Sequence, residues 1–142
     1  MRLIAVPLLA LLVAPALAQK VTTPARDSAE RKAIMNALRP RVEKELGIKV
    51  IFEVTHLKVK GDWAMMTAIP RQTNGKPIDY SKTKLNPEMD AFEDWVCALF
   101  KKDPKTKKWT VKTSALGGTD VSWWGWWDDF KAPKDIFPKT DD

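Results

Sequence analysis

Cysteine, histidine and tyrosine are nearly missing from this chain of 142 residues, which contains one of each. A single cysteine cannot close an internal disulfide, so the fold has to rest on an apolar core. A single histidine excludes histidine-rich zinc sites, and any histidine-dependent triad would have to use that one side chain. The sequence also lacks a glycine-rich phosphate loop. We therefore predict no metal site, no cofactor and no catalytic residue.

Long apolar runs are also missing, with one exception at the amino terminus. Arg2 precedes an apolar run over residues 3–13, and a small-x-small triplet follows at residues 16–18. This layout is typical of a secretory signal peptide and is shorter than a membrane span, which needs ~20 residues. We predict that residues 1–18 are a cleaved signal peptide, that the mature protein starts at Gln19, and that it is periplasmic or secreted.

Neither sign of charge dominates, because 24 Lys and Arg residues stand against 18 Asp and Glu residues, for a net charge of +6. The chain is long enough for one modest domain and too short for two. We predict a single α+β domain over residues 19–130, followed by a proline-containing acidic tail over residues 131–142. We expect the apolar pair Ile136 and Phe137 to hold this tail to the surface of the domain.

An amphipathic helix is predicted over residues 27–46, because apolar side chains recur there at every fourth position. These positions are Ile34, Leu38, Val42 and Leu46. Asp27 and Glu30 have the spacing of a capping box, and Gly47 is expected to end the helix. Pro40 removes one backbone hydrogen bond, which predicts either a kink or a division into two short helices.

Two β-hairpins are predicted after this helix, joining residues 49–59 to 63–69 and residues 91–102 to 107–115. The apolar positions of the first strand change parity partway along, which predicts a β-bulge at Thr55-His56. In the last strand, apolar and basic residues alternate, which predicts one apolar and one basic face of the sheet. The expected apolar positions of that strand are Trp109, Val111, Thr113 and Ala115.

Tryptophan is concentrated near the carboxyl end, where four of the seven tryptophans fall within the five residues 123–127. A short helix is predicted over residues 119–130. Its core-facing side would carry Trp123, Trp127 and Phe130. Trp124 and Trp126 would point elsewhere, and large indoles left in water mark an interaction surface. The sequence leaves open whether this cluster closes the core or binds a partner.

Basic residues form a second candidate surface, which we expect on the exposed face of the sheet. With the two outward tryptophans and the tyrosine of the loop after the first hairpin, the candidate binding residues are Trp124, Trp126, Lys58, Lys60, Lys108, Lys112 and Tyr80. Nucleic acid is not expected as a partner, because the protein is exported and its aromatics are not interleaved with these lysines. The single cysteine, Cys97, lies in an apolar run, which predicts a buried structural thiol rather than a nucleophile.

Three short motifs accompany the leader: Ala29-Glu30-Arg31-Lys32, Gly61-Asp62-Trp63-Ala64 and Thr119-Asp120-Val121-Ser122-Trp123. In this layout the chain resembles a family of short, uncharacterised bacterial secreted proteins. The resemblance implies export and a single domain, and it supplies no catalytic residue. The order of elements also resembles cystatin-like and nuclear-transport-factor-like folds, in which a helix packs on a curved antiparallel sheet.

These observations predict an α+β fold: an amino-terminal helix on a curved antiparallel sheet of about four strands, with a short Trp-rich helix near the end. The leading hypothesis is a non-enzymatic exported binding module for a protein or a cell-envelope polymer, which uses the Trp cluster and the basic surface. A second hypothesis is a small-molecule-binding or enzymatic pocket between helix and sheet. Its polar lining would come from His56, Asp62, Tyr80 and Glu93. A third is association with anionic lipid surfaces.

Overall fold

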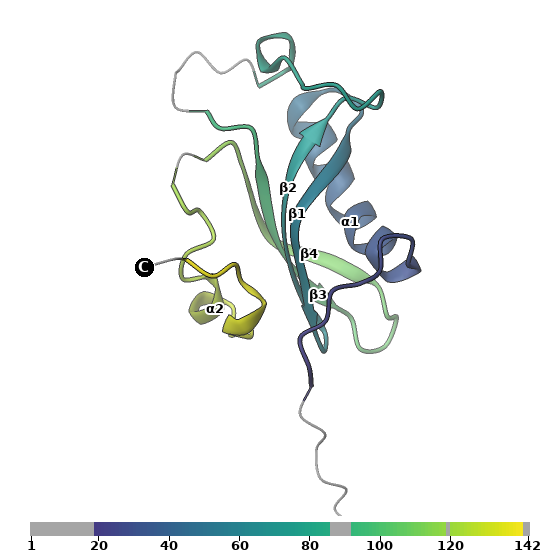
Figure 1. Ribbon diagram of the computed structural model, residues 1–142, viewed down its shortest axis with the longest axis vertical. Coiled ribbons are helices and arrows are strands. Elements are labelled where there is room, and N and C mark those ends of the chain that lie inside the picture. The colour runs from purple at the N-terminus through teal and green to yellow at the C-terminus, as the bar shows by residue number, and fades with distance from the viewer. Residues whose placement is uncertain (1–18, 86–91, 119, 141–142) are drawn as a thin grey trace, which may run out of the picture.

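The computed structural model describes residues 19–85, 92–118 and 120–140. The predicted signal peptide, the first residue of the predicted Trp-rich helix and the last two residues of the predicted tail lie outside these ranges. Within them, no helix is both long enough and apolar enough to cross a membrane. The predicted α+β class is confirmed: one long helix and one short helix pack on opposite faces of a four-stranded antiparallel sheet (Figure 1).

The long helix, α1 (Ala29–Leu46), starts at a different cap from the one predicted. The Ser28 hydroxyl, rather than the Asp27 carboxylate, accepts a hydrogen bond from the backbone N–H of Arg31 at 3.2 Å. The helix runs through Pro40 as one element, so the predicted division into two helices is wrong. Pro40 lies on the exposed side of α1, where its missing hydrogen bond leaves the buried side intact.

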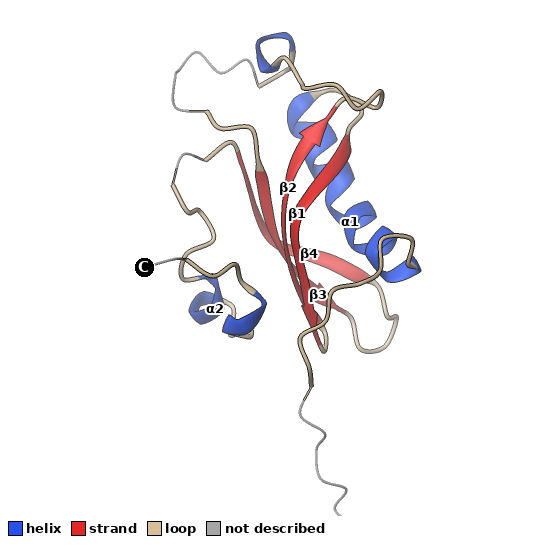
Figure 2. Ribbon diagram, viewed as in Figure 1, coloured by secondary structure: helices blue, strands red, loops and turns tan. Residues whose placement is uncertain are grey.

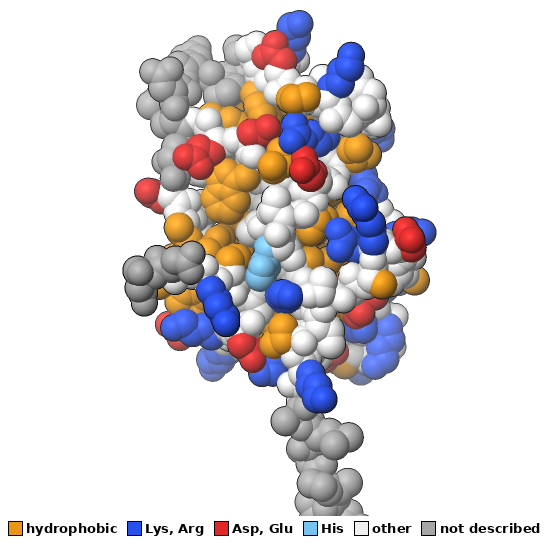
Figure 3. Space-filling view, viewed as in Figure 1, with side chains coloured by type: hydrophobic (Ala, Val, Ile, Leu, Met, Phe, Trp, Pro, Cys, Tyr) orange, Lys and Arg blue, Asp and Glu red, His pale blue; other side chains and the backbone are white. Residues whose placement is uncertain are grey.

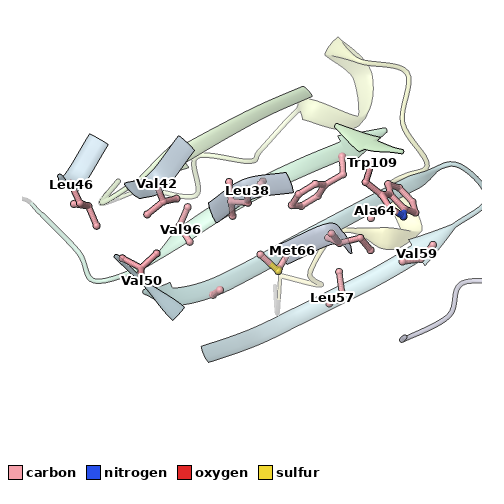
Figure 4. Close-up of a cluster of buried hydrophobic side chains, with 14 of the residues drawn as sticks. Leu38, Val42, Leu46, Val50, Leu57, Val59, Ala64, Met66, Val96 and Trp109 are labelled. Carbon is pink, nitrogen blue, oxygen red and sulfur yellow. The ribbon is translucent and has the colours of Figure 1, made fainter. Parts of the chain in front are cut away.

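The predicted apolar stripe forms the buried side of α1, and its four members are at most 2% exposed: Ile34, Leu38, Val42 and Leu46. Figure 4 shows Leu38, Val42 and Leu46 pointing from α1 toward the strands. They pack there against apolar side chains from all four strands, among them Leu57, Met66, Phe100 and Trp109. This cluster is the helix-side core.

The sheet is a meander in the order β1-β2-β3-β4, in which every strand pairs with its neighbour in sequence (Figure 2). The strands are β1 (Ile51–Lys60), β2 (Trp63–Arg71), β3 (Val96–Lys102) and β4 (Trp109–Leu116). Both predicted hairpins are confirmed, although β3 begins later than predicted. Because of this order, β1 and β4 are the two edge strands.

The predicted bulge in β1 is confirmed. The pairing register shifts between Val54 and His56, which leaves Thr55 without a partner across the ladder. Apolar residues on both sides of the bulge therefore reach the helix-side core, including Val54 before it and Leu57 after it.

A second bulge, in β4, overturns the prediction of one apolar and one basic face. The register shifts between Leu99 and Phe100 of β3, and Lys112 is the extra residue in β4. The parity of β4 therefore reverses at this point. Ala115, predicted to share a face with the start of the strand, packs on the opposite side of the sheet. Ser114 faces α1 instead, where its hydroxyl accepts a hydrogen bond from Arg41 at 3.2 Å.

The face of the sheet opposite α1 is covered by the carboxy-terminal segment and is not an exposed basic surface (Figure 1). This segment contains the helix α2 (Trp126–Asp129) and the 3-10 turn η2 (Lys134–Ile136). Three of its buried side chains, Trp123, Ile136 and Phe137, pack against three residues of the sheet, Met65, Cys97 and Leu99. We call this cluster the tail-side core. Ile136 is 0% exposed and Phe137 is 5% exposed, so the pair holds the end of the chain on the sheet.

The predicted helix over residues 119–130 is reduced to the four residues of α2. Gly125 interrupts it with a φ of +82°, a left-handed conformation that glycine adopts readily and that an α-helix excludes. Trp123 therefore reaches the tail-side core from the turn before α2 and not from the helix itself.

Candidate functional site

A groove lined by tryptophan lies on the outer side of the tail-side core. Its walls are the turn that leads into α2 and the segment from η2 onward. We call it the Trp groove, and its lining residues are Trp123, Trp124, Trp127, Lys134, Asp135, Phe137, Pro138, Lys139 and Thr140. Its volume of about 540 Å³ falls within the roughly 300–1,000 Å³ of small-ligand sites.

The aromatic rings of the Trp groove form a fixed corner. The rings of Trp124 and Trp127 meet almost at right angles, with centroids 5.0 Å apart and an interplanar angle of 78°. Trp127 meets Phe137 in the same manner at 5.3 Å and 79°. Such edge-to-face contacts are favourable because the positive edge of one ring meets the negative face of the other. Trp123 lies beneath them, 6% exposed, and joins the corner to the tail-side core.

Trp124 is the exposed member of this corner. Its side chain is 59% exposed, more than any other large hydrophobic side chain that the structure describes. Contacts with Trp123 and Trp127 hold the ring although most of it faces solvent. An indole that is both exposed and held in place is suited to contact a partner.

Polar side chains with both signs of charge border these rings. The Lys134 ammonium lies 5.0 Å from the centroid of the Trp127 ring, a cation–π contact that covers one face of that ring. The Asp135 carboxylate is paired with the Lys60 ammonium of β1 at 2.8 Å. Lys139 and Thr140 are exposed at the end of the groove. The groove therefore offers hydrogen-bond donors and acceptors beside an aromatic surface.

Trp126 does not belong to the Trp groove. It is half-buried and packs against the tail-side core, whereas Trp124 points into solvent. The helical parity that placed these two side chains together fails because Gly125 lies between them in a left-handed conformation. The candidate pair is therefore separated in space.

The candidate lysines do not gather on one surface. Lys58 and Lys60 lie on the edge strand β1. Lys112 lies on the other edge strand, β4, and Lys108 is the residue just before β4 begins. In Figure 3, basic and acidic side chains are interspersed over the face shown. Lys58 donates a hydrogen bond to Thr23, and Lys60 reaches the Trp groove through Asp135.

Tyr80 lies far from the Trp groove, in the 3-10 turn η1 (Tyr80–Lys82) at the top of Figure 1. Its ring contacts Phe92 at 4.5 Å, and its hydroxyl donates a hydrogen bond to the Asp94 carboxylate. Burial, and then the contact with Asp94, raise the pKa of Tyr80 above its ordinary value. These contacts tie the loop after β2 to the segment that precedes β3.

The residues proposed for a pocket between helix and sheet are not brought together. His56 lies on the face opposite α1, where its Nε2 is 2.7 Å from the Ile136 carbonyl oxygen. Asp62 is in the turn between β1 and β2, and Glu93 is an exposed residue before β3, at the other end of the strands. The space between α1 and the sheet is occupied by the helix-side core.

Burial determines the titration of both His56 and Cys97. Burial lowers the pKa of His56; the hydrogen bond with Ile136 opposes this effect and the charge of Lys58 adds to it. Because the carbonyl of Ile136 can only accept, Nε2 carries the proton. Cys97 is 0% exposed, and burial raises its thiol pKa to about 12. A thiol in this environment is a weak nucleophile.

The sequence pointed to the tryptophan wall of the groove and missed the other wall. Lys134, Asp135, Lys139 and Thr140 were assigned to a tail that the apolar pair Ile136 and Phe137 was expected to hold to the surface, and the structure buries this pair in the tail-side core. Because this pair packs in the tail-side core, the polar residues on either side of it lie next to the tryptophans that pack in the same core.

Among the described residues, no group of three His, Cys, Asp or Glu side chains is placed to hold a metal ion. Comparisons of the chain with protein-family models, with curated proteins and with solved structures find no match. The functional assignment therefore has to come from the geometry of the site itself.

Proposed function

We propose that this protein is a non-enzymatic, exported binding module that holds a protein or a cell-envelope polymer in the Trp groove. The observation that carries the proposal is Trp124, which is 59% exposed and yet fixed against Trp123 and Trp127. Exposed aromatic surface of this kind is unfavourable in water unless a partner covers it, and tryptophan is frequent among residues that dominate binding energy.

The polar border of the groove supports binding rather than chemistry. Asp135 is held in an ion pair with Lys60, and Lys134 rests on the ring of Trp127. Both charges are thus positioned before a partner arrives, which lowers the entropic cost of binding. The groove offers a fixed surface that orients a partner.

Retention on envelope fractions tests this proposal. Purified mature protein, starting at Gln19, is applied to immobilised envelope polymers and, in parallel, to immobilised envelope proteins. We expect retention by one of these fractions, and a decrease of about tenfold or more for Trp124→Ala. Ile51→Ala is the matched control, because Ile51 is also an exposed apolar residue, at 39%, and lies on β1 outside the groove.

Two results would overturn the proposal: equal retention of the wild type and Trp124→Ala, or equal losses for Trp124→Ala and Ile51→Ala. Export is tested separately by cell fractionation and amino-terminal sequencing. A soluble product that retains residues 1–18 would contradict the predicted cleavage.

A further inference from the structure

The lining of the Trp groove points to a class of ligand. Building on the proposed function, we propose that the groove binds a carbohydrate chain, with one sugar ring stacked on the exposed face of Trp124. The polar side chains of the border, chiefly Asp135 and Lys139, would hydrogen-bond to the hydroxyl groups of the sugar.

The stacking surface is the first argument. The C–H groups on one face of a sugar ring carry partial positive charge, which suits the negative face of an indole. Trp124 provides such a face, because it is 59% exposed and its edge-to-face contact with Trp127 fixes its plane. One face of Trp127 is covered by the Lys134 ammonium, so stacking on Trp124 is the better supported of the two.

The mixed polar border is the second argument. Sugar hydroxyls both donate and accept hydrogen bonds, and the groove offers both kinds of partner. Lys134 and Lys139 donate, Asp135 accepts, and Thr140 does either. A proline-rich peptide, which also docks on aromatic grooves, presents mainly carbonyl acceptors and has little use for Asp135.

Asp135 is prepared for this role. One of its carboxylate oxygens, Oδ2, is bound by the Lys60 ammonium at 2.8 Å, and its side chain is 54% exposed. The ion pair fixes the carboxylate while leaving its second oxygen outside this contact. A fixed acceptor beside a fixed ring loses little conformational freedom when a sugar binds.

The shape of the groove is the third argument. One wall is the turn before α2 with the start of α2, and the other is the chain from Lys134 to Thr140, which has no regular secondary structure after η2. Neither wall is a β-strand, so a partner peptide cannot bind here by adding a strand to a sheet. A chain of sugar rings needs no strand edge and contacts such a groove through faces and hydroxyls.

Calorimetric titration with defined probes tests the inference. The sugar probes are oligosaccharides of glucose, of N-acetylglucosamine and of galacturonic acid, which differ in charge and substituents. The other probes are a proline-rich peptide and vesicles of phosphatidylglycerol. We expect saturable binding of at least one oligosaccharide, and weaker or undetectable binding of the peptide and the vesicles.

Substitutions then locate the bound sugar. We expect Trp124→Ala to weaken oligosaccharide binding about tenfold or more, and Trp124→Phe, which keeps an aromatic face, to weaken it less. Asp135→Asn should weaken it severalfold, because a fixed acceptor becomes a neutral amide. Lys105→Gln is the control for lost surface charge, since Lys105 is exposed in the turn between β3 and β4, outside the groove, and it should have no effect.

The possible failures are distinguishable. Saturable binding of the peptide or the vesicles, lost in Trp124→Ala, with no oligosaccharide bound, would overturn the carbohydrate inference and leave the binding module in place. Oligosaccharide binding that Trp124→Ala leaves unchanged would also overturn it. If Trp124→Ala changes neither these titrations nor retention on envelope fractions, both proposals fall.

Discussion

The two faces of the sheet are buried by different means. On one face, α1 places four side chains at regular intervals, and all four are at most 2% exposed. On the other face, short turns from the carboxy-terminal segment bury Trp123, Ile136 and Phe137, while Trp126, Trp127 and Phe130 are covered only in part. The comparison shows that a regular helix closes its face, whereas an irregular cover leaves aromatic surface exposed to solvent.

The largest effect is expected on the helix side. Leu38→Ala removes a 0% exposed side chain from the middle of α1, where regular packing on both sides limits relaxation. We expect the free energy of unfolding to fall by about 3–5 kcal/mol, as measured by urea denaturation. The exposed residue Lys32 on the same helix is the control, because Lys32→Ala should change this value by no more than ~0.5 kcal/mol.

A smaller effect is expected for the corresponding change on the tail side. Ile136 is also 0% exposed, but it lies at the end of η2, a single turn that can settle into the space left by Ile136→Ala. We expect a loss of about 2–3 kcal/mol in the same urea experiment. A loss as large as that of Leu38→Ala would show that the two faces are equally rigid and would break the comparison.

The buried thiol gives the next effect. Cys97→Ser places a hydroxyl among apolar side chains of the tail-side core, and we expect it to lower the free energy of unfolding by about 1–2 kcal/mol. In the native wild type, a thiol reagent should modify Cys97 far more slowly than in the unfolded chain, because the thiol is buried and its pKa is raised to about 12. Rapid labelling of the folded protein would show that the carboxy-terminal segment readily detaches from the sheet.

The helix side was largely predictable because its elements are periodic. The four-residue spacing identified the buried side of α1, and the change of parity identified the bulge at Thr55. The bulge at Lys112 was missed because Thr113 was counted as an apolar position, although Lys112, Thr113 and Ser114 are all polar. Periodicity therefore gives the elements and fails where a run of polar residues leaves the register of a strand open.

The tail side was only partly predictable because its cover depends on long-range docking. The Trp cluster marked one wall of the Trp groove, but the turn at Gly125 separated Trp124 from Trp126. The other wall forms because Ile136 and Phe137 pack on the sheet. The sequence predicted that this pair holds the tail to the domain, but no local pattern shows which surface the pair packs on. The polar residues of the Trp groove could be identified only from the structure, in which Ile136 and Phe137 pack on the sheet.

A pH-dependent effect sharpens the comparison further, because a hydrogen bond from His56 of β1 to the Ile136 carbonyl connects the carboxy-terminal segment to the sheet. Burial lowers the pKa of His56 below its ordinary value of 6.5, so the unfolded chain takes up the proton first as the pH falls. The stability is therefore full above about pH 6.5 and decreases as the pH falls from there through the lowered pKa of the folded protein. His56→Gln keeps a donor for the Ile136 carbonyl but does not titrate, so its melting temperature should fall less over this range. An identical pH profile for both proteins would exclude His56 as the cause.

The smallest effect on stability is expected for Trp124, the residue on which the proposed binding function rests. Trp124 is 59% exposed, so Trp124→Ala should change the free energy of unfolding by no more than ~0.5 kcal/mol. Its neighbour Trp123 is 6% exposed, and Trp123→Ala should cost about 3 kcal/mol in the same urea experiment. Similar losses for the two variants would mean that Trp124 belongs to the core.

The meander also has a consequence for the order of folding. Every strand pairs with its sequence neighbour, whereas the tail returns to β1 over a far greater separation: His56 meets Ile136 after 80 residues and Lys60 meets Asp135 after 75. Closing such long loops is slower than forming adjacent hairpins. We expect α1 and the sheet to assemble first and the tail to dock last. Until it docks, the side chains of Met65, Cys97 and Leu99 face water, which makes this interval the one in which a nascent chain is most prone to aggregate.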